Sequence, residues 1–295
     1  MSCCPTERSR TAGTLLGQSE DKEIFYYVLE EDRLEDALAV LVEGFYRDEP
    51  VSSLYFHVSE DKEAIQELNL LVAEIAKDKI SVIAVSAQTD RVVGVCFNKI
   101  LEKPKPGELP FYEKFKRGCK NAKSIGLIDY MAEIDDKVDV LGAFNVDRVV
   151  ELTFLGVSPA HRNRGIGRDL FTFSLEYVKS KDIAEVACTL GSSVFTQRIA
   201  KKLNFKNMLE VPYERITRTI NYLTGSSAFT KNQFYSLNNC ECNTFNQKAR
   251  GEMVQAYQLR AVESIHFEED RSSIFFFFFF FSNQRINKIA RLGVL

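Results

Sequence analysis

The sequence predicts an α/β (α+β mixed-sheet) protein, in which one central mixed β-sheet has helices on both faces. Two observations favour this class. Short runs of β-branched and aromatic residues, typical of strands, alternate along the chain with stretches whose apolar residues recur at helical spacing. The strongest run, Val149–Val157, predicts a buried strand, and a glycine-containing loop and an amphipathic helix follow it directly.

The first half of the chain predicts one strand, two helices and then two strands that form a hairpin. We expect Asp32 to cap the first helix, with Glu35 three residues later as in a capping box. The two hairpin strands are joined through the polar residues 88–91. The expected ranges are Ile24–Leu29 (strand), Asp32–Tyr46 (helix), Lys62–Asp78 (helix), Ser81–Ala87 (strand) and Val92–Ile100 (strand).

The second half predicts the central strand and the elements around it. After a loop at Pro104–Pro110, residues 111–119 favour a helix, and the less regular segment up to Arg148 allows another. The remaining expected ranges are Val149–Val157 (strand), Gly165–Ser180 (helix), Ile183–Leu190 (strand), Val194–Leu203 (helix) and Phe205–Tyr213 (strand).

The two ends of the chain differ from the part between them. Residues 1–22 are polar and predict a disordered leader. We expect the folded domain to span residues 23–215 and residues 216–295 to form an atypical tail. This tail contains a weakly helical stretch, Glu252–Val262, and seven consecutive phenylalanines, Phe275–Phe281.

The phenylalanine run is too short to span a bilayer, and if exposed it would favour aggregation. A thymidine-rich tract would encode such a run. One hypothesis is therefore that the residues after about 220 come from a misplaced splice junction or a frameshift. Transcript sequencing that reads continuously through codons 215–281 would exclude that origin.

Composition and cysteine usage bound the class of protein. The 38 basic and 41 acidic residues give a net charge of −3, so there is no strong electrostatic case for binding nucleic acid or a membrane. The seven scattered cysteines favour a reducing, cytoplasmic compartment. Cys96 and Cys188 fall inside expected strands, where they would be core thiols. Cys240-x-Cys242 has no second pair at zinc spacing, so we expect no metal site.

A glycine loop, Arg162-x-x-Gly165-x-Gly167, separates the central strand from the next helix. Its glycines allow close approach of a ligand, and the N–H groups and dipole of the helix start favour a phosphate or pyrophosphate. Arg164 and Arg168 also lie in the loop and could add charge-assisted hydrogen bonds. The pattern lacks the glycine spacing of dinucleotide sites and the Gly-Lys-Ser/Thr of P-loops. The alternative is a tight turn with exposed arginines.

This strand, loop and helix resemble the acyl-CoA site of the GNAT N-acetyltransferase superfamily, and the element order over residues 23–215 resembles the GNAT order. The resemblance implies acetyl-CoA as co-substrate, seated where strands splay apart. The backbone of the central strand would bind pantetheine, and the loop would hold the pyrophosphate. The residues so implied are Leu155, Gly156, Val157, Arg162, Asn163, Arg164, Gly165, Ile166, Gly167 and Arg168.

Family members continue into a last strand beside the fifth, and the resemblance stops after Tyr213-Glu214. If the tail is genuine, we therefore expect an unpaired sheet edge and a partly open acceptor pocket.

The segment Phe45-Tyr-Arg-Asp-Glu-Pro50 resembles the Phe-Phe-x-Asp-Glu-Pro segment of the insect arylalkylamine N-acetyltransferases. The resemblance implies that Glu49 is the catalytic base. A carboxylate is needed because an amine with a pKa near ~10 arrives protonated and cannot attack a thioester. The alternative is an acidic residue in a solvated loop.

The segment Gly191–Phe205 resembles a second motif of that subfamily, which implies that the hydroxyls of Ser192 and Thr196 assist the departing thiolate and that Ser193 contacts the cofactor. The alternative for the two serines is a helix N-cap, and both can hold at once. The motif is altered in three places: Thr196 stands for serine, Phe195 for tyrosine and Asn204 for glycine. His161 is interpreted as a loop residue, since the resemblance places no base there.

The resemblance thus implies a monomeric aralkylamine N-acetyltransferase that acts on dopamine, serotonin, tryptamine or octopamine. Two alternatives remain open. One is an acyltransferase for polyamines or with longer acyl donors, although the acceptor-side segments 51–58 and 144–146 are more apolar than acidic. The other is a non-catalytic acyl-CoA-binding protein.

Overall fold

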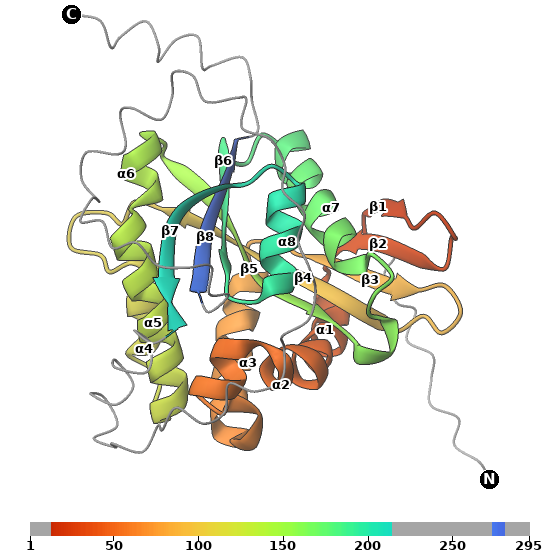
Figure 1. Cartoon of the computed structure of the whole chain (residues 1–295), viewed down its shortest axis with the longest axis horizontal. Helices are drawn as coiled ribbons and strands as arrows, with labels where there is room; N and C mark the ends of the chain where they lie inside the picture. Colours follow the sequence, from red (N-terminus) through yellow and green to blue (C-terminus); the bar gives the residue numbers. More distant parts are fainter. Residues whose placement is uncertain (1–12, 214–272, 281–295) are drawn as a thin grey trace, which may run out of the picture.

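The computed structural model describes residues 13–213 and 273–280. Within them, one mixed sheet has the strand order β1-β2-β3-β4-β5-β6-β8-β7, and every neighbouring pair is antiparallel except β5 and β6. Figure 1 shows this sheet with helices on both sides. The strands are β1 (Leu15–Gln18), β2 (Ile24–Val28), β3 (Val82–Ser86), β4 (Val92–Glu102), β5 (Arg148–Val157), β6 (Val186–Gly191), β7 (Lys206–Pro212) and β8 (Ser273–Phe280).

Helices pack against both faces of the sheet through two hydrophobic clusters. One cluster joins the sheet to α1, α3 and α5, and the other joins it to α7 and α8. The predicted fold class is therefore confirmed. The helices are α1 (Leu34–Val40), α2 (Tyr46–Asp48), α3 (Lys62–Ala76), α4 (Phe111–Lys116), α5 (Ala122–Val138), α6 (Val140–Phe144), α7 (Ile166–Ser180) and α8 (Val194–Lys202).

The structure also has short helical segments of other kinds. The 3₁₀-helices are η1 (Glu31–Arg33), η4 (Val58–Glu60) and η5 (Pro159–His161), and the π-helices are η2 (Leu41–Phe45) and η3 (Val51–Tyr55). The first predicted helix is thus a series, η1-α1-η2-α2, and ends at Asp48. The prediction that Asp32 caps it is wrong, because the series begins at Glu31 and Asp32 lies inside the first turn.

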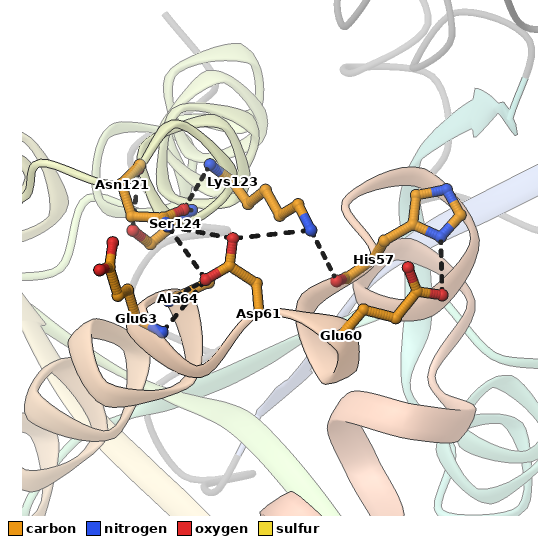
Figure 2. Close-up of polar contacts among 8 residues, drawn as sticks. All are labelled: His57, Glu60, Asp61, Glu63, Ala64, Asn121, Lys123 and Ser124. Atoms are coloured by element: carbon orange, nitrogen blue, oxygen red, sulfur yellow. Dashed lines mark hydrogen bonds and ion pairs between the residues drawn. The ribbon is translucent and has the colours of Figure 1, made fainter.

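The starts of α3 and α5 are tied together by their capping side chains (Figure 2). Asp61 accepts from the backbone N–H groups of Glu63 and Ala64, and so caps α3. Asn121 caps α5 and also donates its Nδ2 to both carboxylate oxygens of Asp61, at 3.2 and 3.1 Å. The Lys123 ammonium lies 3.6 Å from the same carboxylate. This interlock fixes α5, whose side chains face the cavity described below.

The leader prediction is wrong for its last part. Residues 15–18 form β1, which pairs antiparallel with β2 at the sheet edge. Gly17 permits this strand to lie under α7, because a Cβ there would collide with the ring of Phe173. Residues 1–12 lie outside the described part.

The phenylalanine run supplies the strand that was expected to be missing. β8 lies between β6 and β7 and pairs antiparallel with both, with Phe278 opposite Cys188 and Lys206. The rings of Phe278 and Phe144 are 4.6 Å apart, and those of Phe279 and Phe205 are 5.4 Å apart, one contact in each hydrophobic cluster. The expectation of an unpaired sheet edge is therefore wrong.

Residues 214–272 lie outside the described part, and with them Cys240, Cys242 and the predicted helix at 252–262. The origin of the tail therefore stays a hypothesis. Cys96 and Cys188 are completely buried, as predicted. Within residues 13–213 and 273–280, no helix combines the length and apolar character required to cross a membrane.

Candidate active site

A cavity opens where β5 and β6 separate. The two strands pair over three residues only, with Val149–Glu151 of β5 beside Val186–Cys188 of β6. The Thr189 hydroxyl then donates to the Leu152 carbonyl at 2.8 Å, and no β5–β6 pairing is described beyond it. The gap adjoins a cavity of about 530 Å³. Separated parallel strands leave backbone groups of β5 open to a ligand.

The glycine loop lies at this gap and has the backbone its residue types allow. Asn163 and Gly165 have φ angles of 62° and 81°, in the left-handed region that asparagine and glycine tolerate. A Cβ at Gly167 would lie 3.4 Å from Ile199 and 3.6 Å from Leu155, both residues of the cavity wall. No atom of the described residues therefore requires a glycine at 167, whereas a ligand close to the backbone would.

All but one of the predicted cofactor residues line the cavity. The exception is Arg164, which instead pairs with the carboxylates of Asp21 and Glu23 in the β1–β2 turn. The residues that do line the cavity are Leu155, Gly156, Val157, Arg162, Asn163, Gly165, Ile166, Gly167, Arg168 and Ser193.

The other two loop arginines line the cavity but are also ion-paired. The Arg162 guanidinium lies 2.6 Å from the Asp48 carboxylate and donates to the Val157 carbonyl, so it joins the loop to the end of α2. Arg168 pairs with its neighbour Asp169 at 2.8 Å. Hydrogen bonds from Arg47 and Arg162 keep the pKa of Asp48 below its usual value.

Glu49 lies on the cavity wall between α2 and η3, and only 8% of its surface is exposed. Its two carboxylate oxygens accept from the backbone N–H groups of Val51 and Ser52, at 3.0 and 2.7 Å. The alternative of an acidic residue in a solvated loop is therefore wrong. The carboxylate is held in one orientation, with the rest of its accepting capacity open.

The start of α8 brings the predicted hydroxyl residues to the same cavity. Ser192, Ser193 and Thr196 all line it. Ser193 is the N-cap, since its Oγ accepts from the Thr196 N–H at 3.2 Å, and the two hydroxyls are 3.0 Å apart. The capping alternative thus applies to Ser193. Phe195 also lines the cavity and is 68% exposed, and Asn204 has a φ of 63°, which explains how it replaces glycine.

A second buried carboxylate, Glu151, was missed in the sequence. It lines the cavity from β5, with 2% of its surface exposed, and accepts from the Tyr112 hydroxyl at 2.6 Å. Burial raises its pKa to about 7, although the Tyr112 hydrogen bond and the Lys99 charge act in the opposite direction. Burial and the nearby Glu151 also raise the pKa of Asp135. The signal was available, because Glu151 is the one charged residue inside the apolar run 149–157.

The acceptor side of the cavity is mainly apolar and comes partly from α5. Leu127, Tyr130 and Met131 of α5 line it. Residues 144–146, which the sequence suggested for this side, do not. His161 also lines the cavity, and its Nδ1 is buried without a hydrogen-bond partner among the described residues.

Residues 97–205 match a family model described as the acetyltransferase (GNAT) family. The match covers this part of the chain only, so residues 97–205 are similar to GNAT acetyltransferases. The GNAT match contains the glycine loop and α8, and Glu49 lies outside it. GNAT acetyltransferases use acetyl-CoA as co-substrate.

Solved structures with a similar fold include two proteins of the mosquito Aedes aegypti. A candidate arylalkylamine N-acetyltransferase 7 is 15% identical, with a TM-score of 0.63 and 88% of each chain covered. Arylalkylamine N-acetyltransferase 2 is 21% identical, with a TM-score of 0.59, and the alignment covers 65% of this chain and 87% of that one.

A polyamine N-acetyltransferase of Drosophila melanogaster, which forms N-acetylagmatine, is also similar. It is 14% identical, with a TM-score of 0.59, and the alignment covers 88% of this chain and 100% of that one. At these identities the likeness shows the GNAT fold alone. Among curated protein sequences, none matches the chain significantly.

Proposed function

We propose that this protein is a GNAT acetyltransferase that transfers the acetyl group of acetyl-CoA to the primary amine of a small arylalkylamine such as dopamine, serotonin, tryptamine or octopamine. One observation carries the proposal. Glu49, the glycine loop and the hydroxyl residues at the start of α8 come from distant parts of the chain and line one cavity. The residues proposed as base, cofactor site and leaving-group donor thus line the same cavity, which supports the proposal.

In the proposed reaction the neutral amine nitrogen attacks the thioester carbonyl directly. The N–C bond forms, the C–S bond breaks and CoA leaves as a thiolate. The arriving ammonium group loses two protons in all, one to solvent through Glu49 and one that ends on the thiolate sulfur. Ser192 and Thr196 would hydrogen-bond to that sulfur or relay its proton.

The wall of the acceptor side favours a substrate with an aromatic group. Phe45, Phe154 and Tyr130 line the cavity together with Leu127 and Met131. An aromatic ring buried among such side chains gains both apolar burial and ring contacts. Glu49 lies in the same cavity and would face the cationic amine.

A second candidate function is the acetylation of diamines or polyamines, and Glu151 is the observation that favours it. Glu151 and Glu49 are both buried on one cavity, and Asp135 adds a third carboxyl group near Glu151. Lys99, whose charge acts on Glu151, already lies 2.7 Å from Asp78. A second ammonium group of the substrate could therefore be stabilised at Glu151.

The release of CoA by the purified full-length protein tests both candidates. The protein is supplied with acetyl-CoA and a panel of arylalkylamines, diamines and polyamines, and kcat/KM is measured for each. We predict values at least about tenfold higher for the arylalkylamines, which corresponds to roughly 1.4 kcal/mol of differential transition-state binding.

Higher values for diamines or polyamines would replace the first candidate by the second. Turnover only with longer acyl-CoA donors would contradict the acetyl specificity. Binding of acetyl-CoA without turnover of any amine would contradict both candidates and favour a non-catalytic acyl-CoA-binding protein.

A further inference from the structure

The cationic side chains of the cavity fall into two groups. Arg162 and Arg168 belong to the glycine loop, and each is ion-paired with an aspartate. Arg198 and Lys202 belong to α8 and also line the cavity. Neither of them forms an ion pair with any residue in 13–213 or 273–280, so their charges are uncompensated in the described structure.

The two α8 cations lie on the side of the helix that faces the cavity. Phe195, Ile199 and Lys202 line the cavity at intervals of four and three residues. Arg198 also lines it and lies four residues before Lys202, so the two cations are neighbours on the helix surface. Arg198 and Lys202 are both exposed, so they belong to the solvent-facing part of the wall. The capping Ser193 and the hydroxyl of Thr196 are at the opposite, inner end of the helix.

We propose that Arg198 and Lys202 bind the 3′-phosphate of CoA. This inference rests on the proposed use of acetyl-CoA. CoA carries two separate anionic groups, a pyrophosphate and a phosphate monoester on the ribose. The loop and the start of α7 suit the pyrophosphate, because backbone N–H groups and a helix dipole act there.

The monoester needs a separate set of donors, because at pH 7 it carries a charge of about −1.5 to −2 and three accepting oxygens. Arg198 and Lys202 meet that need. The Arg198 guanidinium can donate two parallel hydrogen bonds, and the Lys202 ammonium is a point charge on a flexible side chain. Neither has to break an ion pair with a described carboxylate in order to bind the phosphate. The carboxylates on the cavity wall lie elsewhere in the chain, at Asp48, Glu49 and Glu151.

Binding of CoA and of dephospho-CoA, which lacks only the 3′-phosphate, tests the proposal. Calorimetry is performed without any amine on the full-length wild type and on Arg198→Gln, Lys202→Gln and the double variant. Lys201→Gln is the matched control, because Lys201 precedes Lys202 on the same helix but does not line the cavity. A second series at high salt checks the electrostatic origin.

We expect the wild type to bind CoA at least about tenfold more tightly than dephospho-CoA. Each single variant should lose about three- to tenfold in affinity for CoA, since contacts of exposed charges are partly screened. Its affinity for dephospho-CoA should hardly change. Lys201→Gln should retain the wild-type preference, and high salt should reduce it.

Equal affinity of the wild type for the two ligands would overturn the proposal, as would a failure to bind CoA at all. An equal loss for CoA and dephospho-CoA in the variants would assign the cations to the pyrophosphate and would also overturn it. None of these binding results depends on acetyl transfer. A protein that binds CoA with this preference but turns over no amine would contradict the proposed function alone.

Discussion

Two buried carboxylates on one cavity wall are held in different ways. Glu49 accepts hydrogen bonds from two backbone N–H groups, which fix the orientation of its carboxylate. Glu151 has a tyrosine hydroxyl as donor and a second carboxyl group nearby, and burial raises its pKa to about 7. The fixed orientation of the Glu49 carboxylate on the cavity wall is the geometric basis for proposing it as the proton acceptor. The raised pKa of Glu151 also makes the free energy of unfolding depend on pH.

The buried Glu151 should make the free energy of unfolding depend on pH. Because the pKa of Glu151 is raised in the folded state, its contribution to stability is present below the unfolded value of about 4.5 and is lost as the pH rises through about 7. Glu151→Gln cannot ionise. Between pH 5 and pH 8 the wild type should therefore lose on the order of 2 kcal/mol more free energy of unfolding than the variant.

Denaturant unfolding at the two pH values measures this difference, with the exposed Glu176→Gln as control. Asp135 titrates in the same direction, so the variant keeps some pH dependence. An identical decrease in wild type and Glu151→Gln would show that Glu151 is ionised without cost in the folded protein.

Replacement of Gly167 by alanine should weaken cofactor binding without disturbing the fold. In Gly167→Ala the added Cβ would make only ordinary contacts with Ile199 and Leu155, so the fold should be retained. A ligand that approaches the start of α7 closely would meet the new methyl group. Affinity for acetyl-CoA should therefore decrease about tenfold or more, the usual effect of overpacking.

Calorimetric titration with acetyl-CoA and a melting curve test this expectation. Gly118→Ala is the control, since that glycine is outside the cavity and its Cβ would contact only a backbone oxygen at 3.5 Å. Unchanged affinity in Gly167→Ala would mean that the cofactor does not approach the backbone there.

At the scale of elements, β8 is the strand on which one end of the sheet depends. It pairs with β6 on one side and with β7 on the other, so without it β7 would have no partner strand among those described. Phe278 and Phe279 fill opposite faces, against Phe144 and Phe205. A strand of this composition is protected from aggregation by being internal to the sheet.

We therefore predict that Phe278→Ala in the full-length chain lowers the free energy of unfolding by about 2 kcal/mol. This is less than the roughly 3–5 kcal/mol of a completely buried phenylalanine, because Phe278 is partly buried. Phe195→Ala, at a 68% exposed ring, should change it by less than about 0.5 kcal/mol. Equal values for the two variants in denaturant unfolding would contradict the placement of β8.

The elements with strong local signals are the ones that the sequence predicts well. The strand Val149–Val157, the glycine loop and α7 follow from apolar periodicity and glycine positions within about thirty residues. β1 has only four residues and little periodicity, and pairing with β2 stabilises it. β8 pairs with strands more than sixty residues earlier, a distance at which local patterns carry no information about pairing.

The candidate site shows the same division at the scale of the whole molecule. The residue types of Glu49, Gly165 and Ser192 indicated a function, but their convergence on one cavity is a property of the sheet and its splayed strands. The wall from α5 and the group Tyr112–Glu151–Asp135 were missed, because only tertiary packing buries these carboxyl groups and raises their pKa. The Arg164 pairing with the β1–β2 turn was missed for the same reason.

In the proposed reaction, one cavity combines a bound acyl-CoA with Glu49 as the base. The most direct measurement is kcat with the best amine of the panel, together with the Kd for acetyl-CoA, in wild type and Glu49→Gln. Glutamine can accept only one of the two N–H bonds at this position. Glu49→Asp and a melting curve are therefore measured alongside, and the exposed Glu43→Gln is the matched control.

We predict that kcat falls by about two to four orders of magnitude in Glu49→Gln, while the protein remains folded and its Kd for acetyl-CoA stays close to those of the wild type and of Glu43→Gln. A Glu49→Gln protein that is folded, binds acetyl-CoA and turns over at nearly the wild-type rate would show that Glu49 is not the base.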